Sequence, residues 1–128
     1  MATATVCTAV LGLLVFGLGL GVSRQRRETK TSAGYRDDPA DPLYKWVRAH
    51  GNTVEYAPML AVLMLALGAR TPAAWVEWMM IVATVSRVLF ALGIVTSSTM
   101  ATPHPLRFVG AIGTYAAGIA LSLAMLWS

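Results

Sequence analysis

The chain has 128 residues, of which 56% are hydrophobic and 12% are charged, and its formal net charge is +4. Soluble domains carry about 25% charged residues, so this composition excludes an ordinary soluble domain, and a mean hydropathy of +0.61 indicates a membrane protein. The single cysteine, Cys7, excludes an intrachain disulfide and a cysteine-based metal site.

Four apolar windows are each long enough to cross a bilayer, which takes about 20 mostly apolar residues. They cover residues 3–22, 43–69, 73–96 and 106–127, and they predict an all-α, four-helix transmembrane bundle in one domain spanning 1–128. The first window lacks the basic segment that precedes the apolar run of a signal peptide, which favours a membrane helix. The short connections favour an antiparallel bundle.

Helix starts are marked by two short motifs. Asp41-Pro42 and Thr71-Pro72 each place a side-chain acceptor at a predicted N-cap and a proline at the first helical position, where the missing N–H is harmless. We therefore expect helices to begin close to Leu43 and Ala73. The polar, proline-containing run between Ser97 and Arg107 separates the last two helices.

Positive charge is concentrated in the connection between the first two windows, residues 23–42. This segment carries Arg24, Arg26, Arg27, Lys30 and Arg36. By the positive-inside rule it is a cytoplasmic basic loop, and both termini lie outside the cytoplasm. A basic segment beside a membrane helix mainly sets topology and contacts anionic lipid, so we expect no nucleic-acid partner. Arg24 and Arg26, at the end of the first helix, can also attract an anionic ligand.

A polar stripe follows the second window, because Arg48, Asn52, Glu55 and Met59 are spaced by four, three and four positions. Lipid cannot satisfy such a stripe, so it must face a bundle or a subunit interface. With a rise of about 1.5 Å per residue, Arg87 of the third window lies at a depth in the membrane similar to that of Asn52 and Glu55. Two compatible readings follow: a buried Glu55–Arg87 ion pair that holds two helices in register, and a polar cavity open to the cytoplasm.

Neither histidine has Cys, Asp or Glu neighbours at metal-ligand spacing, so we predict no metal site. His50 lies on the side of its helix opposite the polar stripe and is interpreted as a packing residue, and His104 as a loop residue. The sequence also lacks a nucleophile elbow, a phosphate loop and a dinucleotide fingerprint.

Small residues recur at four-residue spacing in the first and last windows. Gly17 and Gly21 form one such pair, and Gly113 and Ala117 form another. Small residues allow membrane helices to approach closely. Together with a polar stripe that needs more burial than one thin bundle offers, they predict a homotrimer.

The run Arg48-Ala49-His50-Gly51-Asn52-Thr53-Val54-Glu55-Tyr56-Ala57-Pro58 closely resembles the helix-two signature of the MAPEG proteins, the membrane-associated proteins in eicosanoid and glutathione metabolism, and especially their small bacterial branch. Within that signature the pattern Ala-x-x-Asn-x-x-Glu is complete. Arg87 resembles the family's helix-three arginine, Arg107 the arginine near the start of helix four, and Arg24 an arginine that closes helix one. The resemblance covers essentially the whole chain.

The resemblance implies a trimer that holds glutathione between adjacent subunits near the cytoplasmic side, while lipophilic substrates approach from the bilayer. It implies that cationic partners for the two carboxylates come from Arg24, Arg48 and Arg87. Asn52 and Glu55 would bind the peptide and amino group. It further implies that Arg107 favours the thiolate, for transfer to an electrophile or reduction of a hydroperoxide in a bacterial inner membrane.

Two departures from the family pattern weaken the case for catalysis. Tyr44-Lys45 stands where many members have Glu-Arg, and no histidine or tyrosine follows Arg87 on the next turns. The function that the resemblance implies is a glutathione-dependent transferase or peroxidase acting on hydrophobic electrophiles. A non-catalytic lipid-binding or scaffold protein of the same fold is the alternative. A small transporter or channel subunit is disfavoured, because the polar residues do not continue to the outer side.

Overall fold

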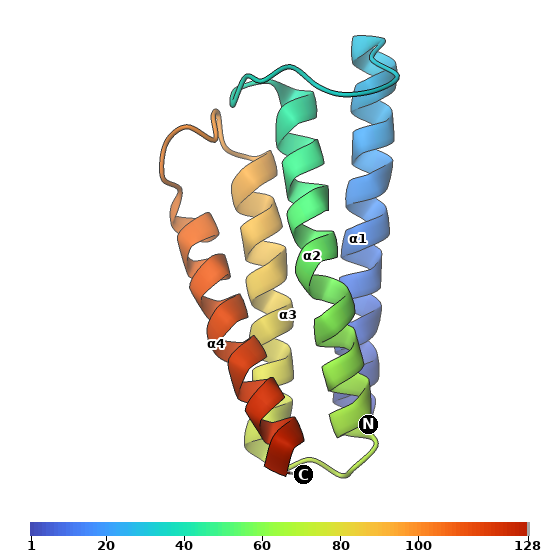
Figure 1. Cartoon of the computed structure of the whole chain (residues 1–128), viewed down its shortest axis with the longest axis vertical. Helices are drawn as coiled ribbons and strands as arrows, with labels where there is room; N and C mark the ends of the chain where they lie inside the picture. The colour runs from blue at the N-terminus through green and yellow to red at the C-terminus, as the bar shows by residue number, and fades with distance from the viewer. Residues whose placement is uncertain (128) are drawn as a thin grey trace.

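The computed structural model describes residues 1–127 and contains four α-helices in this range: α1 (Ala2–Thr29), α2 (Pro42–Gly68), α3 (Ala74–Val95) and α4 (Pro105–Trp127). The helices run side by side as an antiparallel bundle, with both termini at the same end (Figure 1). The two long connections, between α1 and α2 and between α3 and α4, lie at the other end. The predicted all-α, four-helix architecture is confirmed.

The first helix is longer than predicted. It ends at Thr29 and not near residue 22, so Arg24, Arg26 and Arg27 lie on the helix and the connection is reduced to residues 30–41. The apolar window marks only the part of the helix that is suited to lipid. Arginine, glutamine and glutamate also favour the helical conformation in water, so the helix continues beyond that part. The helix stops at Lys30, which adopts the left-handed conformation with φ 52°.

The two predicted N-caps differ in outcome. Asp41 caps α2, since its Oδ2 accepts a hydrogen bond of 3.0 Å from the backbone N–H of Tyr44. Thr71 does not cap α3, because it lies outside the helix with φ 50° and its hydroxyl donates to the carbonyl of Arg70. The N-cap of α3 is Ala73, which offers no side-chain acceptor, so the Thr71 prediction was wrong.

The bundle packs as two close pairs, α1 with α2 and α3 with α4, and α3 contacts both helices of the first pair. Small residues make these pairs possible: a Cβ on Gly21 would collide with the Trp46 ring, and one on Gly113 would collide with the Ser86 hydroxyl. Gly17 has nothing within 4 Å. Ala117 is fully buried, with 0% of its surface exposed. Three of the four predicted small residues therefore pack against helices of the same chain.

Three helices, α1, α3 and α4, are long and apolar enough to cross a membrane. The remaining helix, α2, has 27 residues and about 40 Å of length but carries the polar stripe, which lowers its hydropathy. Trp75, Trp78 and Trp127 are all exposed near the end that carries the termini. Tryptophan gathers at membrane–water interfaces, so these side chains indicate where the bundle leaves the hydrocarbon at that end.

Candidate functional site

Arg87 is the largest fully buried side chain in the described residues, with 1% of its surface exposed. Its Nη2 donates a hydrogen bond of 2.6 Å to Oδ1 of Asn52. The guanidinium lies over two rings, 5.0 Å from the centroid of Tyr56 and 4.7 Å from that of Phe90. Its Nε is buried without a hydrogen-bond partner within residues 1–127. The Asn52 amide and the two aromatic rings thus offset the cost of burying the Arg87 cation, and its Nε donor remains unsatisfied.

The predicted Glu55–Arg87 ion pair is wrong. The only ion pair within 4.0 Å among residues 1–127 joins Arg24 to Glu28. Asn52 and Glu55 are three positions apart, so they point about 60° apart around the helix axis, and only Asn52 faces α3. Glu55 is exposed on the isolated chain.

The polar stripe of α2 is consequently divided. Asn52 lies half-buried against Arg87, whereas Arg48, Glu55 and Met59 are exposed. Arg48 and Glu55 belong to the same face of α2 and are separated by two turns, about 10 Å. The chain therefore presents a cation and an anion on one surface, on either side of the buried Asn52–Arg87 pair.

Arg107 is held by the loop that precedes its helix. Its Nη1 donates to the carbonyls of Met100, at 3.3 Å, and Thr102, at 3.1 Å. The start of α4 packs against Gly93, and Gly93 is six residues from Arg87, so the two arginines are about 9 Å apart along the bundle axis. Arg107 stabilises the connection between α3 and α4, and its other nitrogens remain available.

Arg24 is the most distant of the six predicted site residues. Its Nε donates to Oε1 of Glu28 at 2.7 Å, and the Arg24 side chain is 71% exposed. Gly21 lies beside Trp46, which places Arg24 about 13 Å from Asn52 along the axis. The structure therefore brings Asn52 and Arg87 together, leaves Arg48 and Glu55 beside them on the surface, and keeps Arg24 and Arg107 at the loop end.

A groove of about 490 Å³ between α2 and α4 adjoins this cluster. Tyr56 and Tyr115 line it, with their hydroxyl oxygens 3.2 Å apart and their ring centroids 5.8 Å apart. Most of the remaining lining is apolar. Sequence analysis missed this tyrosine pair. The position of Tyr56, one turn after Asn52, was an available signal, whereas no spacing rule links Tyr115 to it across 59 positions.

The histidines play no part in the cluster. Gly19 of α1 lies beside the His50 ring, so His50 packs between α1 and α2 on the side predicted for it. The Nδ1 of His104 accepts the backbone N–H of Leu106 at 3.3 Å in the loop before α4. Within the described part of the chain, no group of three His, Cys, Asp or Glu side chains is placed to hold a metal ion.

Comparison with known proteins gives one family. The model of the MAPEG family matches residues 4–127, which is nearly the whole chain. Comparison with curated proteins gives no match. With three helices suited to the bilayer, the match identifies an integral membrane protein. The four-helix bundle carrying the Asn52–Arg87 cluster therefore belongs to the MAPEG family.

Proposed function

We propose that the protein binds glutathione and uses it in transferase or peroxidase chemistry on hydrophobic electrophiles within the membrane. The observation that carries this proposal is the buried Asn52–Arg87 pair, joined at 2.6 Å, with Arg48 and Glu55 exposed on the same helix. A buried polar cluster in a membrane helix is costly and marks function. Family membership supports glutathione as the ligand.

The chemistry of the cluster suits that ligand. Arg48 supplies a planar cation for a carboxylate, and Glu55 supplies an acceptor for an amino group. Arg87 and Arg107 are about 9 Å apart along the axis, which is within the span of about 10 Å of an extended tripeptide, so one ligand can reach both. Arg24 lies farther away, so its predicted role requires that a neighbouring subunit bring it to the site.

The lipophilic substrate is proposed to enter through the groove between α2 and α4. This groove of about 490 Å³ is mostly apolar and places two tyrosine hydroxyls beside the Asn52–Arg87 cluster. Pockets of this kind bind apolar ligands and orient them by a few polar groups. We further propose the setting expected from the sequence, a homotrimer in a bacterial inner membrane with both termini outside the cytoplasm.

Glutathione binding by the detergent-solubilised protein tests the proposal. Arg48→Ala should weaken binding by about 1.5–3 kcal/mol, because it removes a charge-assisted hydrogen bond. Arg87→Ala should weaken it similarly, and circular dichroism must show that this buried variant still folds. Arg27→Gln lies at the loop end and serves as the charge-matched control, with unchanged affinity expected. Wild-type protein without affinity at millimolar glutathione would reject the site assignment.

A second measurement separates the enzyme from the alternative, a non-catalytic lipid-binding member. Arg107→Ala should retain glutathione binding but lose the ultraviolet thiolate signal and turnover of a chlorodinitrobenzene, since nearby positive charge favours the thiolate. Two observations favour the alternative: Nη1 of Arg107 is engaged by loop carbonyls, and Phe90, without a hydroxyl, lies against Arg87. Wild-type binding with neither thiolate nor turnover would establish that alternative.

A further inference from the structure

The two long connections at the loop end of the bundle are hydrogen-bonded to each other. The backbone N–H of Met100, between α3 and α4, donates to the carbonyl of Pro39, between α1 and α2, at 2.9 Å. The Met100 side chain also packs against the buried cluster that contains Leu18, Ala49 and Ile94. Met100 is therefore held both by the neighbouring connection and by the core of the bundle.

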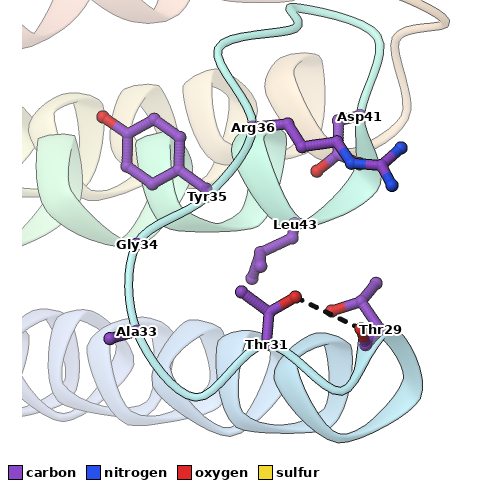
Figure 2. A pocket seen from close by; sticks show the side chains of 8 residues that line it. All are labelled: Thr29, Thr31, Ala33, Gly34, Tyr35, Arg36, Asp41 and Leu43. Atoms are coloured by element: carbon purple, nitrogen blue, oxygen red, sulfur yellow. Dashed lines mark hydrogen bonds between the residues drawn. The ribbon is translucent and has the colours of Figure 1, made fainter.

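The connection that carries Pro39 is itself anchored at both ends. Figure 2 shows it as an arch between the end of α1 and Asp41, the N-cap of α2. Nη1 of Arg26 donates to the carbonyl of Gly34 at 2.8 Å, which ties the first half of the arch to α1. In the second half, the Asp41 N–H donates to the carbonyl of Asp38 at 3.0 Å and closes a turn around Pro39. The Pro39 carbonyl thus has a defined direction, since proline also fixes its own φ.

Lys45 holds the same part of the α3–α4 connection from the first turns of α2. Its Nζ donates a hydrogen bond of 2.7 Å to the carbonyl of Ser97, which is buried and lies just beyond Thr96, the C-cap of α3. A cation is favourable at the C-terminus of a helix. Ser97 is three positions before Met100, so Lys45 fixes the start of the segment 97–100 and Pro39 fixes its end.

This segment in turn holds the guanidinium of Arg107. The carbonyl of Met100 accepts from Nη1 of Arg107 at 3.3 Å, so Met100 links Pro39 to Arg107 through its own N–H and carbonyl. A Cβ on Gly93 would lie 2.8 Å from the backbone nitrogen of Arg107 and 3.0 Å from its Cγ. The stem of Arg107 is therefore placed by close contact with α3, and its head is placed by the connection.

We propose that Lys45 is a positioning residue for Arg107, which it controls by holding the carbonyl of Ser97 and thereby the segment that carries Met100. The inference rests on the proposed function, in which Arg107 favours the glutathione thiolate. A cation favours a thiolate only when it is held close to the sulfur. A displacement of about 1 Å caused by a residue outside the site can cost up to about a hundredfold in rate. Lys45 therefore affects the thiolate without binding the ligand.

The test measures the pH dependence of the ultraviolet thiolate signal, turnover of a chlorodinitrobenzene, and glutathione affinity on the full chain in detergent. In Lys45→Met, the pH at which half of the bound thiol is ionised should rise by about one unit, which lowers turnover about tenfold below that pH. Glutathione affinity should stay unchanged. Lys45→Arg keeps a cationic donor for the Ser97 carbonyl and should restore both signals. A lower melting temperature in Lys45→Met with an unmoved pH midpoint would show a purely structural role and overturn the proposal.

Two further variants separate the contact from the charge of Lys45. Lys30→Met removes an equal charge from an exposed lysine at the end of α1 and should leave the pH midpoint unchanged. Met100→Pro removes the N–H donated to Pro39 without changing any charge, and should raise the midpoint as Lys45→Met does. Circular dichroism checks that each variant folds. A shift in Lys45→Met that is absent in folded Met100→Pro, or equally large in Lys30→Met, would assign the effect to charge and overturn the proposal.

The same measurements separate this inference from the proposed function. Wild-type protein that binds glutathione but forms no thiolate would refute the proposed chemistry and this inference with it. Wild-type protein that forms the thiolate, with Lys45→Met equal to it at every pH, would overturn the role of Lys45 alone and leave the proposed function standing.

Discussion

At the scale of single residues, Arg87 shows how a cation is tolerated inside a membrane bundle. It uses a neutral amide and two aromatic faces where a carboxylate was expected. An amide partner costs less desolvation than a second buried charge, so the arrangement leaves Glu55 free for another role. The Nε of Arg87 has no hydrogen-bond partner in the described residues, so this buried N–H can donate to a ligand.

A double-mutant cycle tests this pairing. Asn52→Ala should destabilise the fold by about 1–3 kcal/mol, because it leaves further Arg87 donors unsatisfied. Combined with Arg87→Met, the loss should be smaller than the sum, with a coupling of about 0.5–3 kcal/mol in the free energy of unfolding, measured by denaturation in detergent. The Glu55→Ala, Arg87→Met cycle is the comparison and should show weaker coupling. A stronger coupling to Glu55 would contradict the structural pairing.

At the scale of the elements, hydropathy and turn chemistry predicted four helices and most of their ends within one residue. The end of α1 was missed, because hydropathy reports suitability for lipid and not helicity in water. The N-cap of α3 was missed because Thr71 satisfies its hydroxyl locally on Arg70. Small residues correctly indicated close helix approach, but spacing alone could not say that Gly21 and Gly113 meet neighbours in the same chain.

The packing of α4 against α3 can be tested with two glycine substitutions, one at the contact and one control on α1. A Cβ on Gly110 would lie 2.6 Å from the carbonyl oxygen of Ser86 and 2.7 Å from the backbone nitrogen of Phe90, and backbone atoms cannot move aside. Gly110→Ala should therefore cost about 1–3 kcal/mol in stability. Gly12→Ala meets nothing within 4 Å and should be neutral or stabilise α1 by up to about 1 kcal/mol. Thermal unfolding in detergent compares the two, and equal effects would contradict the described α3–α4 packing.

At the scale of the whole molecule, the site is less predictable from sequence than the fold. Helical periodicity placed Arg48, Asn52 and Glu55 on one stripe, and the signature run identified the family. Which member of that stripe meets Arg87 depends on the rotation of α2 against α3, and a difference of about 60° decides between Asn52 and Glu55. The contribution of α4 through Tyr115 depends on tertiary packing alone, so no local pattern encodes it.

The exposed charges of α2 lead to the prediction on assembly. Arg48 and Glu55 lie on the outside of one bundle, where charged groups cost about 3 kcal/mol each near the bilayer centre. Further copies of the chain would bury them, so we expect wild-type protein to be a homotrimer by native mass spectrometry in mild detergent. The variant Arg48→Leu, Glu55→Leu removes the need for burial and should shift the population toward monomer, whereas Arg27→Gln, at the loop end, should remain trimeric. Wild-type protein that is monomeric under conditions that retain bound lipid would refute the prediction.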